Sequence, residues 1–191
     1  ITPSETPYMK TSALDIWKAR IPWLLLLMIS ATFSSAILSH FEAVLPAVLV
    51  LFVPMLMDTG GNSGSQSSVT VIRGLSLGEI SFRDTLRVVW KEVRVGILCG
   101  LTLGVVAFGK IMLVDRLLLG NTSVTWYIAL AVSLSMSLCI IVAKLIGCTL
   151  PILAKRLGFD PAVMASPFLT TIVDAVALLL YFFIAHSVFG M

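Results

Sequence analysis

The chain has 191 residues, of which 58% are hydrophobic and 12% are charged, and its mean hydropathy is +1.03. Soluble domains are about half apolar and about one quarter charged, so this composition excludes an ordinary soluble globular protein. It predicts an integral membrane protein, and the small net charge of +3 gives no reason to expect a nucleic-acid partner.

The polar opening segment, residues 1–20, contains prolines and lysines and no cleavable signal peptide. We interpret it as a cytoplasmic lead-in to a transmembrane domain that covers residues 21–191. Because the segment lacks an initiator methionine, we expect the chain to be a fragment of a longer protein.

Five membrane-spanning helices are predicted. A crossing needs about 20 mostly apolar residues, and the clearest runs are 22–40, 95–114, 124–147 and 162–188. A fifth begins near Leu45 and continues toward Ile72 through the polar stretch MDTGGNSGSQSSVT. The segment 74–94 combines helical periodicity with mixed charge, which is typical of an amphipathic helix on the cytoplasmic surface.

The basic residues separate between the two ends of these spans. Ten would lie on one side: Lys10, Lys18, Arg20, Arg73, Arg83, Arg87, Lys91, Arg94, Lys155 and Arg156. Lys110 and Arg116 would lie on the other side, and Lys144 could extend toward the first. This asymmetry predicts a multi-pass protein of the cell membrane with a cytoplasmic N-terminus and an extracytoplasmic C-terminus.

The polar stretch carries a stripe along one face of its predicted helix: Asp58, Asn62, Ser65 and Gln66. Gly60 and Gly64 fall on an adjoining face, where small residues let another helix approach closely. Packing alone would explain the glycines. It explains Asp58 less well, because a carboxylate at the centre of a membrane helix costs about 2.5–3.5 kcal/mol on insertion scales.

The third span contains a further glycine series at four-residue steps, Gly96, Gly100 and Gly104, which predicts a packing seam. The cysteines are scattered in apolar runs without CxxC spacing, so we expect neither disulfides nor a zinc site.

The last span holds a second membrane carboxylate, Asp174. A helix beginning near Asp160 would place Asp174 about 20 Å along it, which is mid-membrane. Thr170, Thr171 and Pro167 precede it on one face and offer hydroxyls and an unpaired carbonyl. A protonated structural aspartate is the alternative. Asp160 suits either a helix cap before a proline or a cytoplasmic mouth that collects cations.

Oxygen ligands of this kind suit a hard cation, and the residues alone leave protons, Na⁺, Mg²⁺, Ca²⁺ and Mn²⁺ open. A proton- or Na⁺-coupled carrier is one alternative. Another is an intramembrane aspartyl hydrolase, because Asp58, Thr59 and Gly60 spell the Asp-Thr-Gly tripeptide and Asp174 could complete a dyad.

Residues 54–80 resemble the signature of the MgtE family of magnesium channels and transporters. The matching residues are Gly60, Gly61, Asn62, Gly64 and Gln66, followed by Arg73, Gly74, Leu75, Leu77, Gly78 and Glu79. The approach to the first span and the last span are also similar to the family, so the resemblance covers nearly the whole chain.

The resemblance implies a homodimer of five-helix subunits that is not an enzyme, with a pore at the subunit interface lined by the second and fifth helices. Asp174 would bind the transported Mg²⁺, with Mn²⁺ or Ca²⁺ possible. Asp160 would lie at the cytoplasmic mouth, and a backbone carbonyl of Thr170 would face the ion. The expected pore lining is Asn62, Asp58, Gly61, Gln66, Thr171 and Pro167. Family members usually carry N-terminal cytosolic regulatory domains, which we expect to be absent from this chain.

Overall fold

A computed structural model describes residues 8–42, 45–161 and 167–190, and all of its regular elements in those ranges are helical. The helices are α1 (Ala13–Glu42), α2 (Ala47–Val50), α3 (Val53–Ser76), α4 (Thr85–Lys110), α5 (Trp126–Arg156) and α6 (Pro167–Phe189). Two short 3₁₀ turns, η1 (Tyr8–Lys10) and η2 (Phe82–Asp84), and a π-helical segment, η3 (Ile111–Leu118), complete the order.

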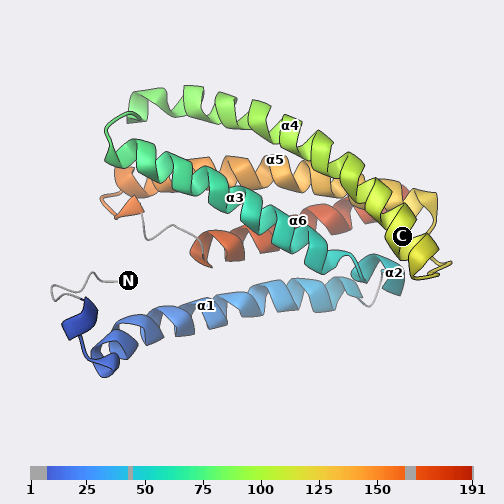
Figure 1. The fold of residues 1–191 in the computed structure, drawn as a ribbon, viewed down its shortest axis with the longest axis horizontal. Coiled ribbons are helices and arrows are strands. Elements are labelled where there is room, and N and C mark those ends of the chain that lie inside the picture. Colours follow the sequence, from blue (N-terminus) through green and yellow to red (C-terminus); the bar gives the residue numbers. More distant parts are fainter. Residues whose placement is uncertain (1–7, 43–44, 162–166, 191) are drawn as a thin grey trace.

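Five of these helices are long, and they run side by side along the length of the molecule (Figure 1). Within the described ranges, four segments are long and apolar enough to cross a membrane: α1, η2 through η3, α5, and α6 from Phe168. The remaining long helix, α3, has 24 residues and so spans about 36 Å, which exceeds a hydrocarbon core of about 30 Å. The chain is therefore an all-helical, multi-pass membrane protein, as predicted.

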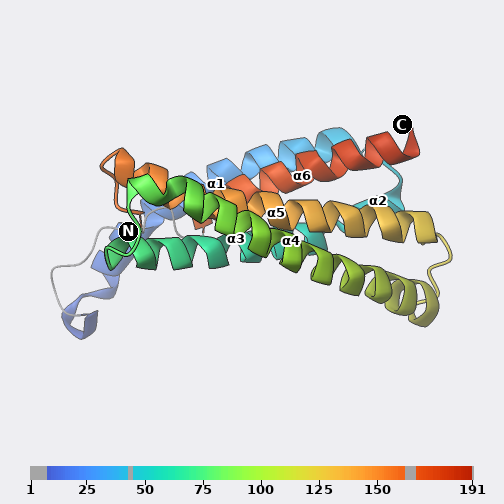
Figure 2. The same ribbon diagram turned by 90° about the horizontal axis from the view of Figure 1, so that it is seen from above.

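Helix α5 lies at the centre of the bundle, in contact with α3, α4 and α6 (Figure 2). Its contact with α4 follows the predicted glycine seam. The Ser137 hydroxyl donates a 2.8 Å hydrogen bond to the Gly100 carbonyl, and a Cβ atom at position 100 would lie 2.7 Å from the Ser137 carbonyl oxygen. The seam thus lets two backbones approach more closely than larger residues would permit.

The predicted separate amphipathic helix over 74–94 is wrong. Helix α3 continues to Ser76, and α4 begins at Thr85 and runs without interruption through the third span. Ser81 and Asp84 cap each other at the start of η2, which leads directly into α4. No proline or glycine then interrupts the helix until Gly96. Mixed charge in the first turns therefore marks the end of a span.

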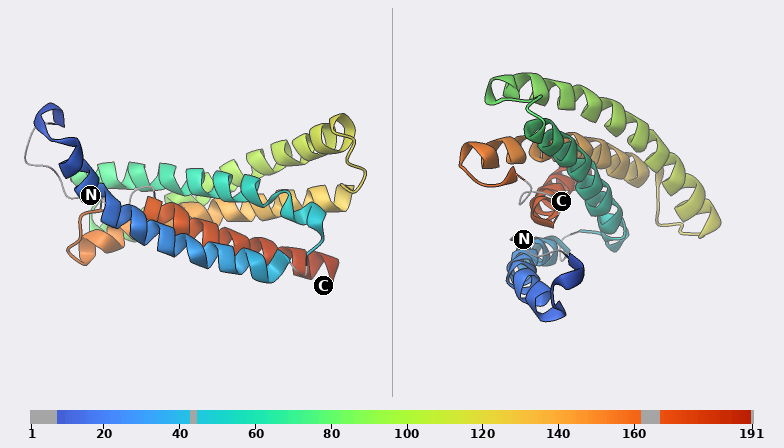
Figure 3. Two further views of the ribbon diagram at one scale, coloured as in Figure 1. Left: turned by 90° about the horizontal axis from the view of Figure 1, so that it is seen from below. Right: turned by 60° about the vertical axis from the view of Figure 1, so that its left-hand side comes forward.

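Helix α1 lies at the edge of the bundle and has no buried residue (Figure 3). It packs mainly against α6, and at their junction the Phe41 ring stacks on Phe182 with centroids 4.4 Å apart. Nearby, the Tyr181 hydroxyl donates a buried 2.8 Å hydrogen bond to the Leu49 carbonyl in α2. The two termini lie at opposite ends of the bundle (Figure 1), consistent with an odd number of crossings.

Candidate functional site

Helix α3 presents its glycines to the rest of the bundle. A Cβ atom at Gly64 would lie 3.0 Å from the carbonyl oxygen of Ala143 in α5 and 3.3 Å from Val173 Cγ2 in α6. At Gly60, the corresponding distance to Val173 Cγ1 is 3.4 Å. The glycines therefore allow α3 to pack into the groove between α5 and α6, as the adjoining-face prediction requires.

The polar stripe lies on the other side of α3. Asp58, Asn62 and Gln66 are exposed in the single protomer, and Ser65 is half-buried. The predicted periodicity is thus confirmed, because the small residues face inward and the longer polar side chains face outward. Within one copy of the described chain, this part of a membrane-length helix is left uncovered.

Asp174 meets α3 at Gly61. A Cβ atom at position 61 would lie 3.2 Å from Thr170 Cγ2 and 3.8 Å from the Asp174 Oδ1 atom. Asp174 is half-buried. This membrane carboxylate on α6 therefore lies beside the α3 backbone at Gly61, the residue before Asn62 of the polar stripe.

The remaining predicted site residues lie before Asp174 in the chain. Helix α6 is described from Pro167 onward, and Asp174 lies seven residues, about 10 Å, beyond that residue. Residues 162–166 lie outside the described ranges, and with them the predicted cap of this helix by Asp160. Asp160 itself is exposed in the link after α5, and Thr171 is half-buried near Asp174.

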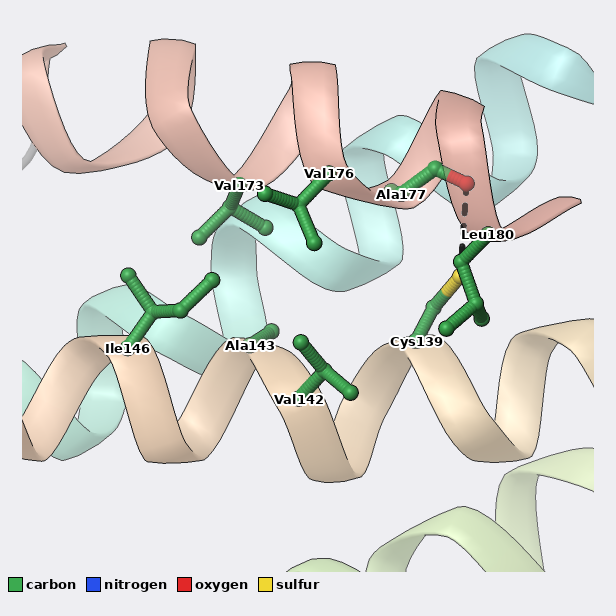
Figure 4. A pocket seen from close by; sticks show the side chains of 8 residues that line it. All are labelled: Cys139, Val142, Ala143, Ile146, Val173, Val176, Ala177 and Leu180. Carbon is green, nitrogen blue, oxygen red and sulfur yellow. Dashed lines mark hydrogen bonds between the residues drawn. The ribbon is translucent and has the colours of Figure 1, made fainter.

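The opposite side of α6, which faces α5, is apolar and closed. The crevice between the two helices has no room for a water molecule. Figure 4 shows its lining, in which the Cys139 thiol donates to the Ala177 carbonyl at 3.7 Å and all other side chains are aliphatic. This crevice therefore gives a hydrated ion no approach to α6 from the side of α5.

The hydrolase alternative requires contact between the two membrane carboxyl groups. In the described ranges no hydrogen bond joins the carboxyl groups of Asp58 and Asp174, whereas an aspartyl dyad shares one proton between two acids in direct contact.

Within one described protomer, no three acidic, histidine or cysteine side chains lie together in a group that could hold a metal ion.

Sequence reasoning missed a buried charge. We expected Lys144 to extend toward the cytoplasmic side, but it is 4% exposed and lies among α3, α4 and α5. Its only sequence signal is its position inside an apolar run. Lys144 contacts Ser67, which lies 77 residues earlier in the chain, and Ser67 in turn contacts Glu92, which lies 25 residues after Ser67.

Comparisons with known proteins agree with this architecture. Residues 53–184 match the MgtE family, described as a divalent cation transporter. The chain is 38% identical over 181 residues to the magnesium transporter MgtE of Thermus thermophilus, covering 94% of this chain and 38% of that protein. It is 36% identical over 170 residues to the magnesium transporter MgtE of Bacillus subtilis, covering 88% of this chain and 36% of that protein. The chain thus spans little more than a third of either relative. The match over most of its own length nevertheless places it plainly: this chain belongs to the MgtE family of divalent cation transporters.

Proposed function

We propose that this chain moves Mg²⁺ across the cell membrane along a path between two copies of itself, walled by α3 and α6. The observation that carries the proposal is the uncovered polar stripe of Asp58, Asn62 and Gln66 beside Asp174. Uncovered carboxylates and amides are unfavourable against hydrocarbon, so this face must meet water or another polar surface.

A second copy would complete the site. One described protomer lacks a cluster of three acidic, histidine or cysteine side chains, so its own side chains of these types do not supply a full ligand set. A two-fold arrangement places the same surface of both copies face to face. Two Asp174 carboxylates would then supply a charge of −2 around the axis, which matches a divalent cation and favours it over K⁺ or Na⁺.

Outer-sphere binding fits the chemistry of the groups on this face. Mg²⁺ keeps its octahedral shell of waters because it dehydrates reluctantly. The carboxylate of Asp174 would accept hydrogen bonds from these waters, as would the backbone carbonyl of Thr170 and the amide oxygen of Asn62. Gly61 has no side chain, which lets Thr170 and Asp174 of α6 lie close to the α3 backbone.

The orientation follows from the basic residues. In Figure 1 the N-terminus, the α3–α4 turn and the α5–α6 link lie at one end of the bundle. These segments and the adjoining parts of the helices carry the ten basic residues enumerated above, whereas Lys110 and Arg116 lie toward the other end. By the positive-inside rule the first end is cytoplasmic, and Asp160 lies at the cytoplasmic mouth of the path.

Replacement of the central carboxylate tests this function. In proteoliposomes loaded with a Mg²⁺-sensitive dye, Asp174→Ala should reduce uptake at least about tenfold, because a loss of about 1.4 kcal/mol or more of ion stabilisation has that effect. Asp15→Ala, which removes an exposed carboxylate in the first turn of α1, is the matched control and should transport normally. Light scattering should show both variants as dimers. Uptake by Asp174→Ala at the wild-type rate would refute the site, and a wild-type monomer would refute the shared path.

A further inference from the structure

Three polar side chains from three helices meet on the inward side of α3, away from the polar stripe. The Lys144 ammonium in α5 donates to the Ser67 hydroxyl oxygen in α3 at 3.4 Å. The Ser67 hydroxyl in turn donates to the Glu92 carboxylate in α4 at 2.5 Å. Lys144 is 4% exposed, Ser67 is 2% exposed and Glu92 is half-buried, so a buried serine bridges a buried cation and a half-buried anion.

The bridge makes the three groups depend on one another. In the described ranges no ion pair within 4.0 Å joins Lys144 directly to Glu92, so Ser67 supplies the hydrogen-bonded link between their charges. Removing one member of a buried charged group leaves the other charge uncompensated, which destabilises a protein far more than replacing both members together. The aliphatic part of Lys144 also packs on the α4 seam, 3.6 Å from where a Cβ of Gly96 would lie.

The cluster lies close behind the proposed ion path. Ser67 follows Gly61 by six residues, about 9 Å along the helix, and Gly61 is the position at which α3 touches Thr170 and Asp174. Between them, Gly64 lies against the carbonyl of Ala143, the residue preceding Lys144. Helix α3 thus contacts α6 at Gly61, and it is hydrogen-bonded to Lys144 of α5 at Ser67.

Packing alone fixes the middle of α3 weakly. The residues that it turns inward near the site are Gly60, Gly61, Ser63, Gly64, Ser67 and Ser68, and side chains this small fill few sockets in a neighbouring helix. Such surfaces permit close approach but provide little resistance to rotation or sliding. Hydrogen bonds to charged groups are directional and stronger than neutral ones, so they favour one rotation of α3 about its axis and one position along that axis.

We infer that Lys144, Ser67 and Glu92 are positioning residues for transport: they hold α3 at the rotation and depth that bring its polar stripe beside Asp174. The inference rests on the proposed ion path, because it assigns the cluster's effect to ion affinity. It predicts that disturbing the bridge changes the Mg²⁺ concentration needed for half-maximal uptake, even where the folded protein persists.

Two adjacent serines provide the test. Ser67→Ala removes the bridge, whereas Ser68→Ala removes a neighbouring hydroxyl that is fully buried and has no hydrogen-bond partner. In proteoliposomes, Ser67→Ala should raise the half-saturating Mg²⁺ concentration about threefold or more, the effect expected from losing a charge-assisted hydrogen bond. Ser68→Ala should match the wild type in half-saturation and unfold at the same or a higher temperature, because it removes a buried hydroxyl without a hydrogen-bond partner in the described ranges.

Charge variants provide the second measurement. Lys144→Met should abolish uptake or prevent folding, whereas Lys144→Met combined with Glu92→Gln should recover protein yield and part of the uptake, because no lone charge remains. Lys144→Arg should retain uptake. The inference is overturned if Ser67→Ala and Ser68→Ala share one half-saturation value, or if the double variant is no better than Lys144→Met. A wild-type chain that transports no Mg²⁺ would instead refute the proposed function.

Discussion

Helices α3 and α5 approach each other most closely at Gly64 and Gly147, and a single methyl group there should separate them. An ideal Cβ at position 147 would overlap the Gly64 carbonyl oxygen and lie 2.9 Å from its carbon and 3.1 Å from its Cα. All three are backbone atoms, which no side-chain rotation can move away. Ordinary van der Waals contact begins at 3.4 Å, so Gly147→Ala requires the two helices to part by about half an ångström or more, and overpacking of this kind costs about 1–3 kcal/mol.

Fluorescence-detected thermal unfolding of the purified protein in detergent measures this effect. Each kcal/mol lowers the midpoint by about 2–4 °C for a chain of this length, so Gly147→Ala should unfold clearly below the wild type. Gly109→Ala is the matched control, because this α4 glycine has no neighbouring atom within 4 Å of its Cβ position. Alanine is favoured over glycine in a helix by about 0.5–1 kcal/mol, so the control should be unchanged or more stable. Equal midpoints for the two variants would refute the close-approach argument.

Three further variants separate the roles of other groups. Asn62→Leu should reduce Mg²⁺ uptake by drying the wall of the path, and unchanged flux in proteoliposomes would show that Asn62 faces elsewhere. Asp160→Asn keeps a good helix cap but loses the charge, so calorimetric titration should show weaker Mg²⁺ binding if the mouth collects cations; unchanged binding would assign Asp160 to capping. Tyr181→Phe removes one hydrogen bond and should lower the thermal midpoint by the equivalent of about 0.5–1.5 kcal/mol. The Leu49 carbonyl still accepts from the backbone N–H of Phe52, so uptake should stay intact; a loss of uptake without destabilisation would contradict this.

The parts of the structure that periodicity can encode were predictable. The 3.6-residue repeat put Asp58, Asn62 and Gln66 on one face of α3 and the glycines on another, and the structure places them so. The four-residue glycine series gave the α4 seam for the same reason. In both cases the information lies within one helix, where the spacing of side chains fixes their direction.

Features that depend on two distant segments were not predictable in this way. The partners of Lys144 lie on α3 and α4, and nothing in the apolar run around Lys144 specifies them. The mixed charge of residues 85–94 also led to the wrong prediction of a separate surface helix, because the first turns of the long helix α4 have the same composition. Helix boundaries set by capping, as at Ser81, are weaker signals than hydrophobic length.

The peripheral place of α1 has a consequence for how the molecule is assembled. Among the described helices α1 is made first, and α6, the helix that it packs against, is made after all the others. The contact between Phe41 and Phe182 therefore forms only after the intervening helices have been made. Until then α1 must remain in the bilayer as an independent helix. Because α1 has no buried residue, it can be surrounded by lipid during this time.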